Sequence, residues 1–294
     1  MKVYIKTYGC QMNERDSEAA AGMLAAIGYG ITTQEEDADI LIFNTCSVRD
    51  QAERKAIGKI GILTRLKKRK PGIYIGIMGC MAQNRGEELL KELPHVDFVI
   101  GTGKLHELPQ ILGTAIKKRH QQLHLEEDEA VLTEMGTHFL TPNQITAYIA
   151  ITRGCNRFCS YCIVPYVRGR EISRAAADIR HEAEILVSQG IKEIMLLGQN
   201  VAAYGLNGDI NPPPPGHSPF AELLSELDAI PGLHRLRFTS PYPSYFNDKL
   251  IATMGALPKV CHSLHLPLQS GSDRILKAMN RHYTATEYLE IVGK

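Results

Sequence analysis

The sequence predicts an α/β protein in which short apolar strands alternate with amphipathic helices through two consecutive domains. Three observations lead to this prediction: a strand–helix alternation in the first part of the chain, a loss of periodicity in the middle, and a second alternation after it. The 294 residues are 44% hydrophobic and 22% charged, which supplies enough apolar surface for two cores.

The first domain, residues 1–116, is expected to hold a parallel sheet. Its central strands are almost wholly apolar, as is typical of strands buried on both faces. The expected strands are Lys2–Tyr8, Asp39–Asn44, Ile73–Met78 and Asp97–Ile100. The expected helices are Asp16–Ile27, Val48–Lys70, Gly86–Leu93 and Leu105–Arg119.

The stretch 117–143 interrupts this pattern. It contains a basic run (KKRH), an acidic run (EEDE), Gly136 and Pro142, without a helical or strand period. Such composition is typical of a connection between domains, so we interpret the stretch as a linker.

The second domain, residues 144–294, repeats the strand–helix order. Series of this kind place their active sites at the carboxyl ends of the strands. The expected strands are Thr146–Thr152, Glu193–Leu197, Arg235–Ser240 and Ser263–Gln269. The expected helices are Ala175–Gln189, Pro219–Ala229, Asn247–Met254 and Ser272–Met279.

Charge and hydropathy exclude some classes of protein. The formal net charge of +1 gives no whole-chain signature for nucleic acid, so contacts with RNA must come from local patches. No apolar run approaches the roughly 18 residues that span a bilayer, and the N-terminus lacks a signal-peptide core. We therefore expect a soluble, cytoplasmic protein with no membrane partner.

Seven cysteines offer candidate ligands, because an odd count argues against a closed disulfide framework. Three of them lie in the segment RGCNRFCSYC, directly after the first strand of the second domain. We call Cys155, Cys159 and Cys162 the loop triplet. Thiolates this close in one loop can converge on one iron–sulfur cluster, and three ligands leave one iron of a 4Fe–4S cluster open. Zinc, the main alternative, usually shows paired C-x2-C halves, which are absent here.

Three further cysteines, Cys10, Cys46 and Cys80, each follow an expected parallel strand by one or two residues. We call them the strand-end triplet. Because parallel strands bring their carboxyl ends to one edge of a sheet, we expect these cysteines to meet there. Gly9 and Gly79, which precede two of them, allow tight turns toward a bulky ligand. The alternative is that the cysteines are apolar residues that follow strands by chance.

The loop triplet, with the aromatic Tyr161 before its last cysteine, resembles the cluster loop of radical S-adenosylmethionine (SAM) enzymes. The resemblance implies that the open iron holds the amino and carboxylate groups of SAM. It also implies cofactor contacts at Tyr161, at Gln199 in LGQN, and at Arg174 in RGREISR, with a further contact at Gln269, at the end of the fourth strand. For Arg174, Gln199 and Gln269 the alternative is a role in packing or loop capping.

Over essentially its whole length, the chain resembles the radical-SAM methylthiotransferases. The matching motifs are YGCQMNERDSE, NTCSVRDQAERK, MGCMAQ, RGCNRFCSYC, RGRE and HLPLQSGS. The resemblance implies an N-terminal methylthiotransferase domain followed by a radical-SAM (β/α) barrel. It further implies a second 4Fe–4S cluster on Cys10, Cys46 and Cys80, whose open iron carries the sulfur to be transferred, and two SAM molecules per turnover.

Family members have six barrel strands and a further small β-barrel domain, whereas only four barrel strands are expected here. The barrel is therefore expected to be partial and the chain truncated at its C-terminus.

The motifs YGCQMN and NTCSVRDQAE are most similar to those of one branch of the family. That branch methylthiolates carbon 2 of N6-isopentenyl-adenosine beside the anticodon in tRNA. The alternatives are threonylcarbamoyl-adenosine in tRNA, an aspartate of a ribosomal protein, or a non-catalytic iron–sulfur protein. The resemblance implies as partners a tRNA, a reducing electron donor such as a flavodoxin, and a sulfur donor. We expect a monomer, and no catalytic residue beyond the cluster ligands.

Overall fold

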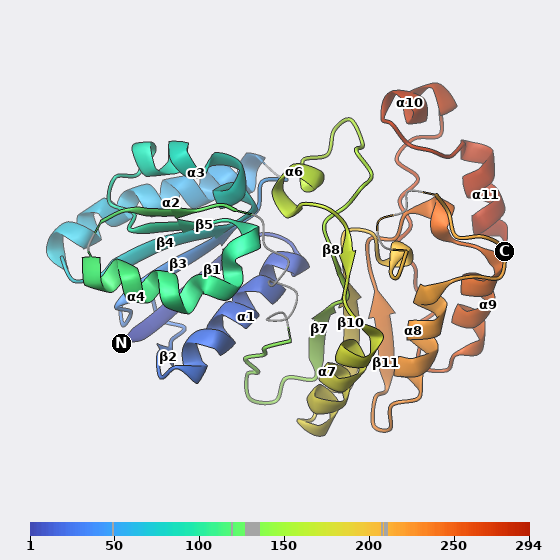
Figure 1. Cartoon of the computed structure of the whole chain (residues 1–294), viewed down its shortest axis with the longest axis horizontal. Helices are drawn as coiled ribbons and strands as arrows, with labels where there is room; N and C mark the ends of the chain where they lie inside the picture. Colours follow the sequence, from blue (N-terminus) through green and yellow to red (C-terminus); the bar gives the residue numbers. More distant parts are fainter. Residues whose placement is uncertain (49, 119, 127–135, 207, 209–210) are drawn as a thin grey trace. The chain divides into compact units, whose positions relative to one another are not determined.

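The structure, a computed structural model, describes residues 1–48, 50–118, 120–126, 136–206, 208 and 211–294 (Figure 1). It forms two compact units. The first comprises Met1–Leu140 with Tyr166–Arg168, and the second comprises Thr141–Pro165 with Gly169–Lys294. The predicted α/β class is confirmed, with a parallel sheet in the N-terminal unit. The expected linker falls partly on residues 119 and 127–135, which lie outside the described residues, and the expected domain boundaries stay a prediction.

The first unit is built on a six-stranded sheet in the order β2-β1-β3-β4-β5-β6, in which every pairing is parallel. The central strands β3 and β4 are buried along their whole length, which explains their unbroken apolar sequence. Four of the strands were predicted; the two short outer ones, β2 and β6, were not, and β6 lies within the expected linker. The strands are β1 (Lys2–Tyr8), β2 (Gly30–Ile31), β3 (Ile40–Thr45), β4 (Tyr74–Gly79), β5 (Phe98–Ile100) and β6 (Gln122–His124).

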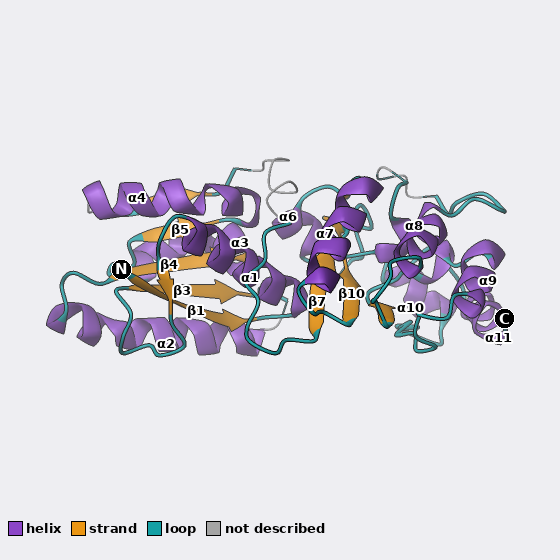
Figure 2. Ribbon diagram, turned by 90° about the horizontal axis from the view of Figure 1, so that it is seen from below, coloured by secondary structure: helices purple, strands orange, loops and turns teal. Residues whose placement is uncertain are grey.

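Helices cover both faces of this sheet (Figure 2). Alternate residues of β3 point to opposite faces, so that Ile40 and Ile42 pack in one core while Leu41 and Phe43 pack in the other. All four side chains are fully buried, and each contributes roughly 1.5–3 kcal/mol to folding. The helices are α1 (Gln11–Ala26), α2 (Asp50–Arg69), α3 (Cys80–Glu92) and α4 (Leu108–Lys118), with a 3-10 turn, η1 (Thr102–Glu107).

Helices α1 and α3 begin earlier than the sequence predicts. Helix α1 starts at Gln11 with Cys10 as its N-cap, and α3 starts at Cys80 after Gly79. The prediction was wrong by about one and a half turns in each case because neither start carries the Ser, Thr, Asp or Asn that usually marks an N-cap. Two cysteines of the strand-end triplet therefore lie at helix N-termini.

The second unit contains a three-stranded parallel sheet in the order β11-β10-β7 and a two-stranded antiparallel ribbon of β8 and β9. The strands are β7 (Thr146–Ala150), β8 (Thr152–Arg153), β9 (Ile172–Ser173), β10 (Glu193–Leu197) and β11 (Arg235–Phe238). The helices are α7 (Ala176–Ser188), α8 (Pro219–Asp228), α9 (Asp248–Ala256), α10 (Asp273–Ala278) and α11 (Ala285–Gly293), with 3-10 turns η2 (Val201–Ala203) and η3 (Pro243–Tyr245). A further helix, α6 (Val164–Arg168), begins in this unit, and its last three residues belong to the first unit.

The predicted fourth strand, Ser263–Gln269, is wrong: this segment forms no strand. Pro267 has no N–H for a sheet ladder. Two carbonyls of the segment accept hydrogen bonds from tyrosine hydroxyls instead, Leu268 from Tyr283 at 2.8 Å and Leu266 from Tyr288 at 2.6 Å. The segment is thus held by Tyr283, just before α11, and by Tyr288 within α11, and it does not extend the sheet.

In the described part of the chain, none of the helices combines the length and the apolar character that crossing a membrane requires.

Candidate functional site

The strand-end triplet lies at one edge of the first sheet. The last residues of three adjacent strands pair in one row, Tyr8 with Thr45 and Thr45 with Gly79. Cys10, Cys46 and Cys80 follow these residues by two, one and one positions. The backbone N–H of Cys46 also donates to Tyr8 O at 2.9 Å, which continues the ladder one step beyond the strands.

The thiols of this triplet are electrostatic neighbours. Burial raises the pKa of the Cys46 thiol, and the proximity of Cys80 and Cys10 raises it further. Opposing this, the Val48 N–H donates to Cys46 Sγ at 3.3 Å. Cys10 and Cys80 stand at the N-terminal ends of α1 and α3, where the partial positive charge of the helix stabilises an anionic ligand.

A buried ion pair lies beside the strand-end triplet in the same unit. Arg168 Nη2 is 2.8 Å from Asp16 Oδ2, and both side chains are almost completely buried. Burial disfavours the charge on Arg168, yet the pKa of its guanidinium is raised because Asp16, Cys80 and Cys10 are close. The positively charged Arg168 therefore lies close to the cysteines that are expected to be thiolates.

The loop triplet lies between β8 and α6 in the second unit, and its thiols form no disulfide. Burial raises the pKa of Cys155 to about 12, although the Arg157 N–H donates to its Sγ at 3.4 Å. A metal bound here must displace the thiol protons, since only the thiolate is a ligand.

A distant segment of the same unit fixes the cysteine loop. Ser160 donates from its backbone N–H to Met279 O at 3.1 Å, and Asn280 Nδ2 donates to Phe158 O at 2.7 Å. Arg281 Nη1 donates to Cys159 Sγ at 3.4 Å. The sequence analysis missed Arg281, because the 122 residues that separate it from Cys159 leave no local signal of the contact.

Three buried polar atoms at the carboxyl end of β7 and β10 have no hydrogen-bond partner within the described chain: Thr152 Oγ1, Gln199 Oε1 and Asn200 Nδ2. An unpaired buried polar atom costs about 1–3 kcal/mol, so such a group indicates a place for a polar ligand. Gly198 lies so close that a Cβ there would overlap Thr152 Oγ1. The predicted cofactor contact at Gln199 therefore stands next to atoms that suit a small polar ligand.

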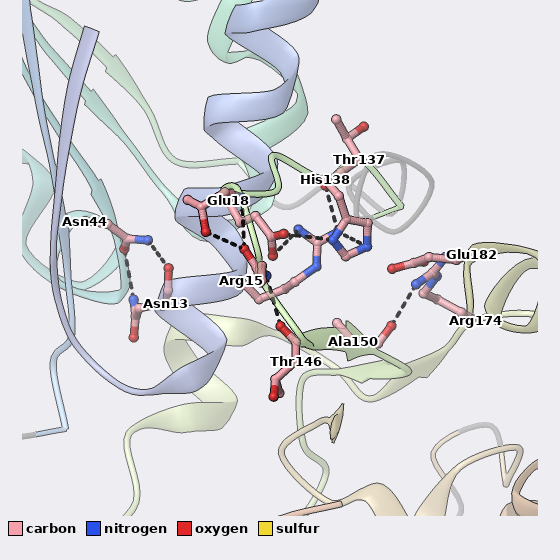
Figure 3. Close-up of polar contacts among 12 residues, drawn as sticks. Asn13, Arg15, Glu18, Asn44, Thr137, His138, Thr146, Ala150, Arg174 and Glu182 are labelled. Carbon is pink, nitrogen blue, oxygen red and sulfur yellow. Dashed lines mark hydrogen bonds and ion pairs between the residues drawn. The ribbon is translucent and has the colours of Figure 1, made fainter. Parts of the chain in front are cut away.

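The guanidinium of Arg174, the predicted contact of the SAM carboxylate, is already engaged. It forms an ion pair with Glu182 Oε2 at 2.6 Å and donates to Ala150 O at 2.9 Å, as Figure 3 shows. This arrangement favours the alternative of packing between β7 and α7. Contact of Arg174 with a cofactor stays a prediction.

The two other predicted cofactor residues lie in exposed positions. The Tyr161 side chain is 53% exposed. Gln269 is exposed and has a φ of 71°, so the chain turns there through the left-handed region. Their roles stay predictions.

Comparison with known proteins adds to this geometry. Two family models match the chain: "Uncharacterized protein family UPF0004" over residues 2–101 and "Radical SAM superfamily" over residues 149–294. The tRNA-2-methylthio-N(6)-dimethylallyladenosine synthase of Opitutus terrae is 48% identical over 320 residues, covering 99% of this chain and 66% of its own. The enzymes of that name from Caldicellulosiruptor saccharolyticus and Dictyoglomus thermophilum are also 48% identical, over 293 and 294 residues.

The chain belongs to the radical-SAM methylthiotransferase family. It spans 61–66% of the length of these three relatives. Membership of a radical-SAM family implies a 4Fe–4S cluster and SAM.

Solved structures of radical-SAM proteins share the fold of this chain. The radical SAM methyltransferase TsrM from Kitasatospora setae superposes with a TM-score of 0.69 at 14% identity, covering 99% of this chain and 65% of TsrM. The cobalamin-dependent enzyme OxsB superposes with a TM-score of 0.60 at 10% identity, covering 47% of OxsB.

Each of the two triplets offers three cysteine thiols as donors. Among the described residues, no three His, Cys, Asp or Glu side chains are close enough to share a single metal ion. Thiolate is also the usual ligand of iron–sulfur clusters, so the donors of each triplet have the chemistry that such a cluster requires.

Glu171, in the RGRE motif of this family, is a carboxyl with an unusual environment. Glu171 is only 7% exposed. Burial raises the pKa of its carboxyl to about 7, whereas the positive charge of Arg157 lowers that pKa. The folded apo-protein therefore keeps the Glu171 proton at pH values where the unfolded chain has lost it.

Glu171→Gln should remove a pH-dependent part of the stability. Because the folded pKa is raised, the free energy of unfolding of the parent falls as pH rises from about 4.5 to about 7. The difference between the two proteins over this window should be on the order of 2–3 kcal/mol. Urea unfolding of the iron-free proteins measures it. Glu184→Gln, at an exposed carboxyl on α7, is the control, and an E171Q curve parallel to the parent would contradict the prediction.

Proposed function

We propose that the chain holds two 4Fe–4S clusters, one on Cys10, Cys46 and Cys80 and one on Cys155, Cys159 and Cys162. The observation that carries this proposal is the in-row pairing of Tyr8, Thr45 and Gly79, which gathers the strand-end triplet at one sheet edge of the first unit, whereas the loop triplet belongs to the second unit. Each set offers three thiolates, so one iron of each cluster stays open for another ligand.

We further propose that the whole protein transfers a methylthio group to carbon 2 of N6-isopentenyl-adenosine in tRNA. The names of relatives 48% identical to nearly all of this chain support the substrate. A reduced cluster with SAM supplies one-electron chemistry, which this substrate needs because its aromatic C–H bond offers no acid–base route. The function requires a reducing electron donor and a source of sulfur as partners, and tRNA in the cytoplasm as substrate.

The protein residues have distinct tasks in this proposal. Thr152 Oγ1 and Gln199 Oε1, which have no partner within the described residues, would accept hydrogen bonds from the SAM ammonium. Asn200 Nδ2 would donate to its carboxylate. The hydrogen bonds of Arg157 N–H and Arg281 to Cys155 and Cys159 fix the sulfurs and help to set the reduction potential.

A substrate assay tests the function. After anaerobic reconstitution with iron and sulfide, we expect about eight irons per chain. We expect a 2-methylthio product on tRNA bearing N6-isopentenyl-adenosine, detected by mass spectrometry of the nucleosides. The same tRNA without the isopentenyl group is the control. Product on threonylcarbamoyl-adenosine tRNA instead would assign the chain to another branch, and about one bound zinc with no SAM cleavage would refute the enzyme.

A further inference from the structure

Two asparagines lie directly beneath the strand-end triplet. Asn13 belongs to the first turn of α1, three residues after Cys10, and Asn44 belongs to β3, two residues before Cys46. Both residues are completely buried. The close-up in Figure 3 shows their side chains facing one another.

The two residues are joined by a pair of hydrogen bonds, one between their side chains and one from the Asn44 side chain to the Asn13 backbone. Asn13 Nδ2 donates to Asn44 Oδ1 at 2.9 Å, and Asn44 Nδ2 donates back to Asn13 O at 2.7 Å. A further hydrogen bond joins Asn44 Nδ2 to Ser17 Oγ at 3.0 Å. The start of α1 is thereby tied to the end of β3.

The pair also reaches the backbone beside each cysteine. Asn13 Oδ1 accepts from the Cys10 N–H at 3.4 Å, and Asn13 Nδ2 approaches Thr45 O, next to Cys46, at 3.5 Å. Gly79, which precedes Cys80, has a φ of 97°, and a Cβ there would overlap Asn44 Oδ1. The glycine therefore lets the third turn close directly onto the asparagine pair.

These contacts favour a structural role for the two asparagines over contact with the substrate. A residue that touches substrate must present a free polar group, whereas these amides are fully buried and bond within the protein. Burying an amide is unfavourable unless it is hydrogen-bonded, so the pair is stable only as a unit. The sheet ladder ends at Thr45 and Gly79, and beyond it the pair links the turns that carry the cysteines.

We propose that Asn13 and Asn44 form a positioning pair that sets the spacing of Cys10, Cys46 and Cys80 so that one 4Fe–4S cluster reaches all three. The inference rests on the proposed function, because it assumes a cluster on this triplet. The three cysteines follow three separate strands, so no short loop holds their spacing, and a cross-link between neutral amides supplies it. The pair carries no net charge, and in the iron-free chain the Cys10 thiol donates to Asn13 Oδ1 at 3.4 Å.

The test uses the chain with Cys155, Cys159 and Cys162 replaced by alanine, so that only the strand-end triplet can hold a cluster. We expect this parent to bind about four irons after anaerobic reconstitution. Asn13→Ala and Asn44→Ala should each release that iron to a chelator about 10-fold or more faster, as is typical for residues that orient metal ligands. The double variant should lose iron no faster than the worse single variant, because the residues act as one unit.

Asn247→Ala is the matched control. It also removes a hydrogen-bonded asparagine, the N-cap of α9 in the second unit, whose Oδ1 accepts from Leu250 N–H at 3.0 Å. Its melting temperature should fall, while its iron release and the electron paramagnetic resonance (EPR) spectrum of its reduced cluster should match the parent. If Asn44→Ala does not fold, Asn13→Ala carries the test alone, since alanine is favourable in a helix.

The outcomes separate the inference from the function on which it rests. Iron retention and EPR spectra equal to the parent in both asparagine variants would overturn the positioning pair and leave the cluster in place. A parent that binds no iron would overturn the cluster on the strand-end triplet, and the inference with it.

Discussion

Cys155→Ala should abolish SAM cleavage and leave about half of the iron. The variant removes one of three thiolates from a single loop, and the remaining two cannot hold a cluster with one open iron. The strand-end triplet lies in the other unit and keeps its own three ligands. The measurements are 5′-deoxyadenosine formed per chain under strong reductant and iron bound per chain after reconstitution.

Cys46→Ala is the matched variant. It should also lose about half of the iron, yet still cleave SAM when no tRNA is present, while forming no methylthio product. If Cys155→Ala cleaves SAM and Cys46→Ala does not, the tasks of the two triplets are exchanged. If both variants keep the full iron content, the proposed ligand sets are wrong.

Asp16→Asn should destabilise the iron-free chain by about 3–5 kcal/mol at pH 7. The substitution preserves the shape of the side chain and removes its charge, which leaves the Arg168 guanidinium buried without a counter-charge. Such a loss is large because the whole stability of a domain is typically about 5–15 kcal/mol. Urea unfolding followed by circular dichroism measures it.

Asp50→Asn tests the same chemistry at the surface. Arg54 Nη2 lies 2.6 Å from Asp50 Oδ2, but both side chains are mostly exposed, so water compensates each charge. The expected change is within about 0.5 kcal/mol. Equal losses in the two variants would show that burial of the Asp16–Arg168 pair is not what makes it important.

Sequence periodicity was sufficient to predict the strands that carry the strand-end triplet. Unbroken apolar runs such as Ile40–Phe43 admit few alternatives to a buried parallel strand, and parallel strands end at a common edge. Proximity of Cys10, Cys46 and Cys80 therefore followed from local pattern alone. Their ligation of a cluster is a proposal that needs the iron measurements above.

Sequence periodicity does not predict contacts between segments that lie far apart in the chain. Arg168 beside Asp16 and Arg281 beside Cys159 pair residues more than a hundred positions apart, and a cation in a loop or after a helix looks like any solvated charge. The prediction of a strand at Ser263–Gln269 was wrong because a clear local pattern was overridden by tertiary contacts. Its alternation is that of a strand, but hydrogen bonds from Tyr283 and Tyr288 occupy its carbonyls.

The different construction of the two triplets has a consequence for the order in which they load with iron. The loop triplet lies within one short segment, so the conformational entropy lost in gathering its thiols is small even before the second unit folds. The strand-end triplet exists only once β1, β3 and β4 have paired. Iron supplied during refolding should therefore enter the loop first, and enter the sheet edge only at the rate at which the first unit folds.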